Sequence, residues 1–509
     1  IATARLQEAF NAMALDTLPR GRPVRQIIAK NTQVSSAFDA ITYQKGAQVL
    51  AMFESFVGAE TFADALRLHL ERFRHGTATS EDFFETLSEA AKHPKLIVAL
   101  QSFVDQTGVP LVSLHPQQGK LALAQERFRP LGVEPTAAQR WIIPMCVSAA
   151  AERSCTLLDG RTSTLDVPFT GRALMPNAGG AGYYRFRLDG GAWDRLIEAA
   201  PNLSGPEALA LADSVWSDFS AGTGDFARVI AATKALSSHP DRLAVLEIGN
   251  RMRELSSSVL PIEQFDDYRS MMRAIYGPRL EALGIDVRRG AHAKEAPQLQ
   301  SLRQALLPLV ALEGRDPELR AELTDAAVAY LEGESARLDP AFRADAFAVA
   351  VQERGVPFMR ELRDALAKST EPLFREQALI GLAAADTPQL ARAALEMSTS
   401  EGIHSLETVR ILLGLSRRPL ARDATVAFVE REFERVIEAF PAFLRPQLST
   451  LFARSCATED IAKVEAFIRP RLATLGGGEL ELEQTKQRIA LCAALRKAKQ
   501  GEIAAVLRN

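Results

Sequence analysis

The spacing of hydrophobic residues changes twice along this chain of 509 residues and divides it into three regions. In residues 1–108 the apolar residues recur every three or four positions. In residues 109–190 the period falls to two, so that Leu121 and Leu123 share one face of an extended segment. In residues 191–509 the spacing of three and four returns. A period near 3.6 indicates amphipathic helices and a period of two indicates half-buried strands, so the chain is predicted to be mainly α-helical with one β region.

The first region is predicted to contain several amphipathic helices. One of them, Ala59–Arg74, is expected to bury four large apolar residues on one face: Phe62, Leu66, Leu70 and Phe73. Another is expected to begin near Thr79, because Asp82 follows it at the position typical of a capping box. The first residues of the chain, Ile1–Asp16, also have helical spacing, so we expect the chain to open within a helix and to be part of a longer protein.

The second and third regions differ in kind. Short strands separated by turn-forming residues predict a small antiparallel β-sandwich in residues 109–190. The helical segments of residues 191–509 are separated by pairs such as Asp316-Pro317 and Asp339-Pro340. This spacing predicts helical hairpins of about 35–45 residues that stack like HEAT or armadillo units into an irregular bowl.

Composition excludes some classes of function. The net charge is −3 and the sequence pI is about 6.3, whereas nucleic acids and anionic membranes usually require a basic excess. The longest apolar runs, such as Ala346–Val351, are far shorter than the roughly 20 residues that span a bilayer. We therefore expect neither a nucleic-acid partner nor a membrane segment.

No complete active site is evident from the residues alone. None of the seven histidines is followed by glutamate, so the sequence has no HExxH metal-binding helix. His69 and His75 lie six positions apart, which is not a ligand spacing on a helix, and they are interpreted as surface residues. The glycine-rich segment Asn177–Tyr184 precedes a predicted strand, which indicates a turn and not a dinucleotide loop. No metal ligand is assigned.

One segment resembles a known family. Phe38–Gly46 reads FDAITYQKG and continues as AQVLAMFESFVG. This is similar to the motif F-x-x-I-[ST]-Y-x-K-G-x-x-V-L-x-M of the M1 aminopeptidases, zinc enzymes of the gluzincin type that include aminopeptidase N and the puromycin-sensitive enzyme. The similarity is specific between about residues 36 and 190 and diffuse beyond. Further segments that resemble the family are Asp16 with Arg22-Pro23, Gly76–Phe84, Phe103–Pro110, Trp141–Pro144 and Asn177–Arg185.

The resemblance implies a role for one residue. Tyr43 matches the family's catalytic tyrosine, whose hydroxyl donates to the oxyanion formed when zinc-bound water attacks the scissile carbonyl. A phenol suits this task because it is neutral at working pH and can be held rigidly as a donor. For Asp39, Lys45 and Gly46 we favour structural roles in helix-start packing and charge pairing.

The resemblance also implies what this chain lacks. In the family the zinc histidines, the general-base glutamate, the distal zinc glutamate and the glutamates that bind the substrate's N-terminus precede this motif, and none of them is in this sequence. The zinc is therefore expected to be bound outside this chain, and the chain alone is expected to be inactive.

Two functions remain open. The first is a part of a zinc-dependent aminopeptidase acting on peptides: the helical end of a thermolysin-like catalytic domain (1–108), a β-sandwich (109–190) and a helical domain (191–509) that covers the active site. The alternative is a non-catalytic α-solenoid scaffold that retains an aminopeptidase remnant. The reading frame upstream of Ile1 discriminates them, because an in-frame HExxH would support the enzyme.

The four cysteines are informative about the cellular compartment in which the protein works. Their arrangement suggests two local disulfides, Cys146–Cys155 and Cys456–Cys492, and four buried free thiols are an equally open alternative. Disulfides would favour a periplasmic or secreted protein, and free thiols a cytoplasmic one.

Overall fold

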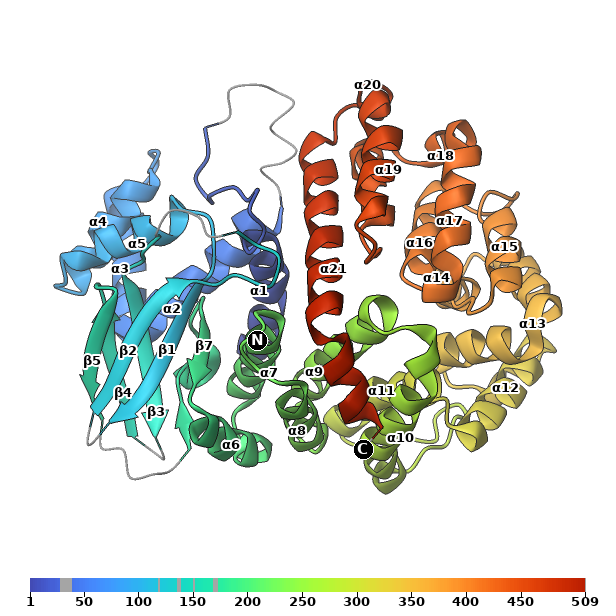
Figure 1. Cartoon of the computed structure of the whole chain (residues 1–509), viewed down its shortest axis with the longest axis horizontal. Helices are drawn as coiled ribbons and strands as arrows, with labels where there is room; N and C mark the ends of the chain where they lie inside the picture. Colours follow the sequence, from blue (N-terminus) through green and yellow to red (C-terminus); the bar gives the residue numbers. More distant parts are fainter. Residues whose placement is uncertain (28–38, 118–119, 135–138, 150–151, 168–172, 509) are drawn as a thin grey trace. The chain divides into compact units, whose positions relative to one another are not determined.

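The chain forms two compact units, residues 1–248 and residues 249–509 (Figure 1). The computed structural model describes residues 1–27, 39–117, 120–134, 139–149, 152–167 and 173–508. Phe38, the first residue of the aminopeptidase-like motif, lies outside the described residues. Helices dominate both units, and the strands of the described residues lie in the first. The three-domain division predicted from the sequence stays a prediction.

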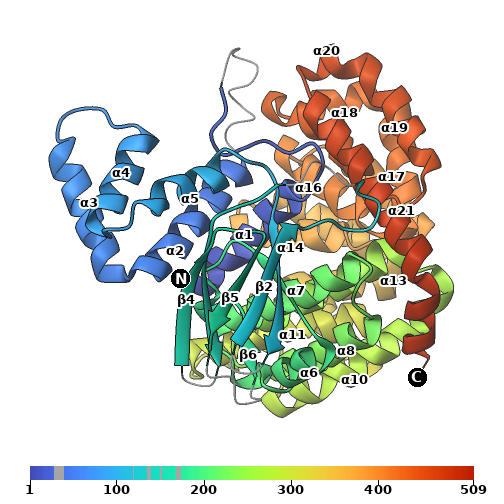
Figure 2. The same ribbon diagram turned by 60° about the vertical axis from the view of Figure 1, so that its left-hand side comes forward.

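The first unit begins with helices whose apolar faces match the sequence spacing. Leu6, Phe10 and Met13 of the first helix are buried, as expected for residues three and four positions apart. Gly58, with φ of +92°, ends one helix in a conformation that favours glycine. Figure 2 shows the helices of residues 46–104 at one side of the strands. The helices are α1 (Ala2–Asp16), the π-helical turn η3 (Ile41–Lys45), α2 (Gly46–Val57), α3 (Ala59–Arg72), α4 (Ser80–Ala90) and α5 (Lys95–Val104).

The predicted capping box at Thr79 is confirmed. The Thr79 hydroxyl accepts a hydrogen bond from the Asp82 backbone N–H at 3.2 Å, and the Asp82 carboxylate accepts one from the Thr79 N–H at 2.7 Å. These Thr79 and Asp82 contacts are the reciprocal pair that defines the motif, and they hold the start of α4.

The expected burial of one face of α3 is wrong. Phe62 and Phe73 are half-buried, while Leu66 is 40% and Leu70 is 70% exposed. Ala65 is the buried residue of this fully described helix. Helical spacing shows which residues share a face, but it does not show whether another element covers that face.

The strands form two sheets that lie one behind the other (Figure 1). One sheet has the order β5-β2-β1-β7 and the other β4-β3-β6. Leu121 and Leu123 are buried on one face of β2, as their alternation predicted. The strands are β1 (Pro110–Gln117), β2 (Lys120–Arg127), β3 (Ile143–Ala149), β4 (Glu152–Leu158), β5 (Thr162–Asp166), β6 (Leu174–Met175) and β7 (Arg185–Leu188).

The prediction of a purely antiparallel sandwich is wrong at one strand. β7 pairs with β1 in the parallel direction, with Leu111 opposite Arg185 and Leu114 opposite Leu188. The other ladders are antiparallel. Two residues of sequence separate β1 from β2 and β3 from β4, a spacing that favours the antiparallel direction, whereas β2 to β6 lie between β1 and β7 in the chain, so no hairpin sets the direction of β7.

The first unit closes with a run of helices, among them α7 (Gly205–Ser220), which packs beside β7. A buried ion pair joins the strand to α7, with Arg185 Nε 2.9 Å from Asp213 Oδ2. The same guanidinium lies 4.3 Å from the ring of Phe128 and donates to the Thr17 hydroxyl at 3.2 Å. The helices are α6 (Gly190–Glu198), α7 (Gly205–Ser220), α8 (Phe226–Ser237) and α9 (Arg242–Glu254), the last of which runs into the second unit.

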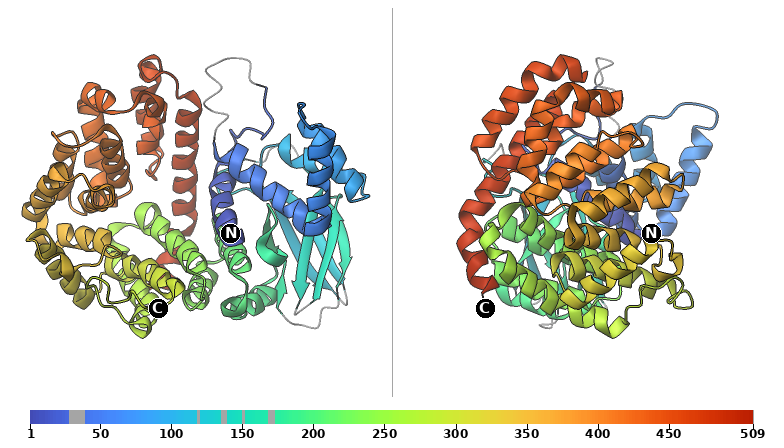
Figure 3. Two further views of the ribbon diagram at one scale, coloured as in Figure 1. Left: turned by 180° about the vertical axis from the view of Figure 1, so that it is seen from behind. Right: turned by 90° about the vertical axis from the view of Figure 1, so that its right-hand side faces the viewer.

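In the second unit, the described residues form helices, turns and loops. Consecutive helices such as α12, α13 and α14 pack side by side, and Figure 3 shows this succession from two further directions. The HEAT- or armadillo-like bowl stays a prediction. The main elements are η6 (Leu255–Val259), α10 (Phe265–Leu283), α11 (Pro297–Pro308), η8 (Leu309–Glu313), α12 (Pro317–Leu331), α13 (Arg343–Lys368), α14 (Pro372–Leu382), α15 (Pro388–Met397), α16 (Ser405–Ser416), α17 (Pro419–Arg431), α18 (Phe433–Ala439), η10 (Ala442–Phe452), α19 (Glu459–Ile468), α20 (Leu472–Leu475) and α21 (Glu479–Leu507). No helix among the described residues is long and apolar enough to cross a membrane.

Both suggested disulfides are present. Cys146 and Cys155 are directly opposite each other on β3 and β4, with Cα atoms 4.1 Å apart. Cys456 and Cys492 join the loop before α19 to α21, with Cα atoms 4.9 Å apart. Each bridge therefore links two elements within one unit.

Exposure in α3 can be tested by truncating two leucines. We expect Leu70→Ala to change the free energy of unfolding by less than about 0.5 kcal/mol, since its side chain is mostly in water. Leu100→Ala, in the core of α5 with 0% exposure, should cost about 2–5 kcal/mol. Urea unfolding measures both. An equal cost at the two sites would contradict the exposed position of Leu70.

The disulfides predict the outcome of a thiol titration. The denatured, unreduced protein should have no free thiols, and after reduction it should have four. Removing the Cys456–Cys492 bridge, which spans 36 residues, should lower the free energy of unfolding of the second unit by about 4 kcal/mol in the chain-entropy model. Four free thiols before reduction would contradict both pairs.

Candidate active-site turn around Tyr43

Tyr43 lies in η3, the π-helical turn that leads into α2. Its backbone N–H donates to the carbonyl of Asp39 at 3.3 Å, and its side chain is 59% exposed. Two neighbours in the same turn point the other way, since Ile41 and Lys45 are buried. Such π turns are frequent at functional sites, because they alter the direction of a side chain without ending the helix. The turn thus presents a phenol to solvent while its neighbours anchor it.

The start of the turn is fixed by Asp39. Its Oδ1 accepts the backbone N–H groups of Ile41 at 2.8 Å and Thr42 at 3.2 Å. Arg22 pairs with the same carboxylate, with Nε 3.1 Å from Oδ2, and donates to the Thr42 hydroxyl at 2.7 Å. A carboxylate that accepts the first N–H groups of a helix satisfies donors that lack a partner in the helix. The interpretation of Asp39 as a helix-start residue is confirmed.

The end of the turn is fixed by a buried ion pair. Lys45 Nζ lies 2.8 Å from Asp16 Oδ2, and both side chains are 0% exposed. Lys45 also donates to the carbonyl of Gln106 at 2.9 Å. Burying two charges is costly unless each is paired and hydrogen-bonded, and both conditions are met here. The charge-pairing interpretation of Lys45 is confirmed.

Asp16 is the centre of a larger network. Its Oδ1 accepts the backbone N–H of Gly108 at 2.6 Å, and its Oδ2 accepts the hydroxyl of Tyr183 at 3.1 Å. Burial, and then the Asp16 charge, raise the pKa of Tyr183 well above its usual range, so this phenol remains a donor. Gly108 has φ of +103°, a conformation that side chains rarely adopt. One carboxylate therefore joins α1, the turn, the segment before β1 and the loop before β7.

Gln48 ties α2 to the same loop. Its Nε2 donates to the carbonyls of Gly180 at 3.2 Å and Ala181 at 2.8 Å, and its Oε1 accepts from Arg5 of α1 at 3.3 Å. Sequence reasoning missed Gln48 and Tyr183 as supports of the turn. The signal available was modest: Tyr183 belongs to a segment with family resemblance, but nothing in the sequence connects it to Lys45.

The described residues do not fit a catalytic zinc. No group of three or more His, Cys, Asp or Glu side chains in the described part of the chain could hold a metal ion. His69 instead contacts the Thr86 hydroxyl at 3.5 Å and packs against Phe73 and Phe83. We therefore assign no zinc ligand to the described residues.

Comparison with known families defines the class of this protein. The Peptidase family M1 domain matches residues 1–106, which include the Tyr43 turn, and the ERAP1-like C-terminal domain matches residues 173–491. The second match covers more than half of the chain and agrees with its mainly helical structure. The chain belongs to the M1 aminopeptidase family and corresponds to the C-terminal portion of its members.

Individual relatives agree with this assignment. Aminopeptidase M1-C of Oryza sativa subsp. japonica is 25% identical over 534 aligned positions, which cover 99% of this chain and 58% of that protein. Aminopeptidase M1 of Arabidopsis thaliana is 24% identical over 445 positions, covering 82% of this chain and 49% of that protein. Glutamyl aminopeptidase of Mus musculus is 28% identical over 201 positions, which cover 38% of this chain and 21% of that protein. The chain spans about half the length of the M1 aminopeptidases that it matches over most of its own length.

The buried pair can be tested by removing one charge. Lys45→Met should lower the free energy of unfolding of the first unit by about 3–5 kcal/mol, because it leaves the Asp16 charge buried without its cation. Lys95→Met is the matched control, since Lys95 is 61% exposed and its pair with Asp159 should be worth no more than about 1 kcal/mol. Chemical denaturation compares the two variants. A loss no larger than that of the control would show that Lys45 does not anchor the turn.

Proposed function

We propose that this chain is part of a zinc-dependent aminopeptidase that removes N-terminal residues from peptides. The observation that carries the proposal is the position of Tyr43, exposed on a turn whose two ends are anchored by Asp39 and Lys45. The relatives named above as aminopeptidases and the M1 peptidase match over residues 1–106 support it. In this proposal the zinc is held by residues outside this chain.

The role we propose for Tyr43 is donation of a hydrogen bond to the oxyanion that develops on the scissile carbonyl. Such a donor accelerates the reaction if its hydrogen bond is stronger in the transition state than with the bound substrate. That requires a phenol held before the charge develops. The anchors on both sides of Tyr43 supply this rigidity, and Tyr43 itself is 59% exposed.

We propose further that the protein works in an oxidising compartment, such as the periplasm or the extracellular space. All four cysteines are paired in disulfides, and such bonds persist mainly outside the reducing cytosol. Alkylation of free thiols in intact cells, followed by denaturation and mass measurement, tests this. Complete alkylation at all four cysteines would contradict it.

Replacing Tyr43 with Phe tests the catalytic role in a complete peptidase that contains this chain. The ring and its packing remain and one hydroxyl is lost. Turnover should fall by roughly 10²–10³-fold, which corresponds to about 2.7–4 kcal/mol, with little change in KM. Zinc content should be unchanged, because the phenol is not a metal ligand in this scheme.

The control is Tyr330→Phe, which removes the hydroxyl from a ring that packs against Phe347 and Phe374 in the second unit. This variant should keep full turnover. A raised KM with unchanged turnover in Tyr43→Phe would make Tyr43 a substrate-binding residue. Full activity in that variant would rule out the catalytic role, and would favour the scaffold alternative if the complete protein also lacked peptidase activity.

A further inference from the structure

The two halves of the Cys146–Cys155 disulfide differ in their exposure to solvent. Cys146 lies on β3, the central strand of its sheet, where α2 packs against the strand, and it is 6% exposed. Cys155 lies on β4, the strand at one end of the same sheet, and it is exposed. A reagent in solution therefore reaches the bridge from the side of Cys155.

An arginine contacts the buried sulfur. Arg153 lies two residues before Cys155, so both side chains are on the same face of β4. Its Nη2 donates to Cys146 Sγ at 3.3 Å, and to the carbonyl and the hydroxyl of Ser55, each at 2.7 Å. Ser55 belongs to the last turn of α2. The helix that packs against β3 therefore also holds the guanidinium beside the buried sulfur.

These two properties favour exchange with thiols. A thiolate opens a disulfide by attacking one sulfur while the other leaves, so the rate depends on access to the attacked sulfur and on the stability of the leaving thiolate. A neighbouring guanidinium stabilises a thiolate, because it places a positive charge and an N–H donor beside the negative sulfur. Access favours attack at Cys155, and Arg153 favours the departure of Cys146.

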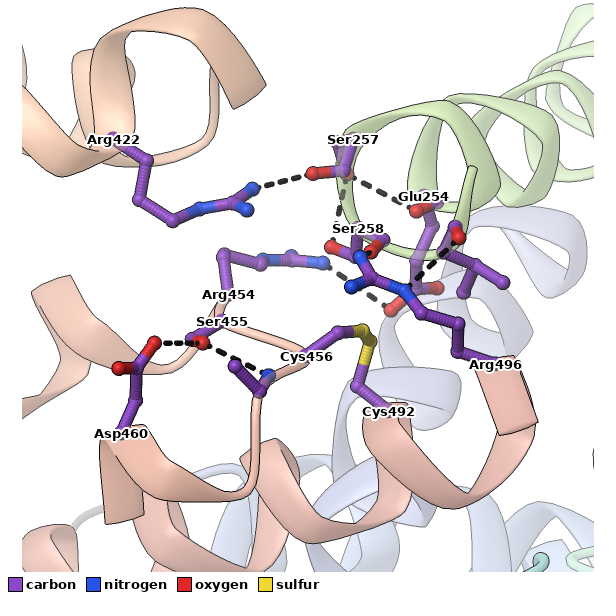
Figure 4. Close-up of a disulfide and its surroundings, with 12 residues drawn as sticks. Glu254, Ser257, Ser258, Arg422, Arg454, Ser455, Cys456, Asp460, Cys492 and Arg496 are labelled. Atoms are coloured by element: carbon purple, nitrogen blue, oxygen red, sulfur yellow. Dashed lines mark hydrogen bonds and ion pairs between the residues drawn. A yellow bond between two sulfur atoms is a disulfide. The ribbon is translucent and has the colours of Figure 1, made fainter. Parts of the chain in front are cut away.

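The second disulfide has no exposed half. Cys456 is 6% exposed, and Cys492 of α21 is half-buried. Figure 4 shows this bridge between the loop that carries Cys456 and the helix that carries Cys492. Because exposed disulfides are the labile ones, the two bridges of this chain should differ in their rate of exchange.

Two arginines hold the end of η6 beside this second bridge (Figure 4). Arg422 of α17 donates to the carbonyl of Ser257, and Arg496 of α21 donates to that of Val259 at 3.1 Å. The last carbonyls of a helix lack partners within it and carry partial negative charge, so cations are favourable there. These contacts join α21 to a distant part of the unit, so more than the bridge itself holds its surroundings.

We propose that Cys155 is a site of thiol–disulfide exchange with a low-molecular-weight thiol, with Cys146 as the leaving sulfur and Arg153 as the residue that stabilises its thiolate. The attacking thiol loses its proton to water, and its sulfur forms a new bond with Cys155 Sγ. The Cys146–Cys155 bond breaks, and its electron pair remains on Cys146. The product is a mixed disulfide at Cys155. Attack by the Cys146 thiolate on that mixed disulfide restores the bridge and releases the thiol.

Reduced glutathione is the probe for the native whole chain. After rapid quenching with excess N-ethylmaleimide, peptide mapping by mass spectrometry locates glutathione and maleimide on each cysteine. We expect glutathione on Cys155 and maleimide on Cys146, and exchange at this bridge about tenfold or more faster than at Cys456–Cys492, the matched control within the same molecule. Glutathione on Cys146 in place of Cys155, or equal rates at the two bridges, would overturn the proposal.

Variants of Arg153 test its role at the leaving sulfur. Arg153→Gln removes the positive charge beside Cys146 and should slow exchange by about tenfold, a loss typical for a hydrogen bond to a charged group. Arg153→Lys keeps a cation near the sulfur and should keep most of the rate. The control is Arg161→Gln, which removes an exposed arginine just before β5 and should exchange as the parent chain does.

The outcomes separate stabilisation of the thiolate from a packing role. If Arg153 only clamped β4 to α2, its removal would loosen the cover over Cys146 and exchange would become faster. Unchanged or faster exchange in Arg153→Gln, or an equal loss in Arg153→Lys, would therefore overturn the role of its charge. An equal loss in Arg161→Gln would also overturn it, because the general attraction of glutathione to a positive surface would then explain the effect.

Discussion

The carboxylate of Asp16 is the interaction on which the first unit depends. Within hydrogen-bond distance of its two oxygens lie a lysine amine, a phenol and a backbone N–H, contributed by segments 29, 167 and 92 residues away in the chain. Every partner is buried, so each bond is made where water cannot replace it and where its loss would leave an unsatisfied group. The network therefore specifies one arrangement of α1, the Tyr43 turn and the loop before β7.

Within the five residues of η3, some side chains anchor the turn in the core and one is exposed. Ile41 and Lys45 supply burial and charge pairing, and Tyr43 between them is left exposed. In a regular helix, residues two apart face different directions, so one turn can have both buried side chains that anchor it and an exposed side chain between them. The π-helical geometry of η3 sets that direction, and the two flanking ion pairs, Arg22–Asp39 and Asp16–Lys45, keep it from changing.

The sequence predicted local features well and contacts between distant segments poorly. The period of hydrophobic residues located the helices and strands, and Thr79 with Asp82 located a helix start, because these signals are contained within a few residues. Packing between distant elements determines the exposure of Leu66 and Leu70 and the parallel pairing of β7 with β1. No short sequence pattern predicts such packing. The family motif identified Tyr43, but its supports Tyr183 and Gln48 became evident only from the structure.

The arginines that hold the end of η6 connect residues far apart in the second unit. Arg422 reaches Ser257 across 165 residues, and Arg496 reaches Val259 across 237. Contacts with such long separations must wait until both partners exist, and during synthesis a chain emerges from its N-terminal end at about 5–20 residues per second. At that rate the Val259 carbonyl at the end of η6 lacks its donor, Arg496 of α21, for roughly 12–47 seconds while the intervening helices are translated. The second unit therefore completes its fold only after Arg496 has been translated.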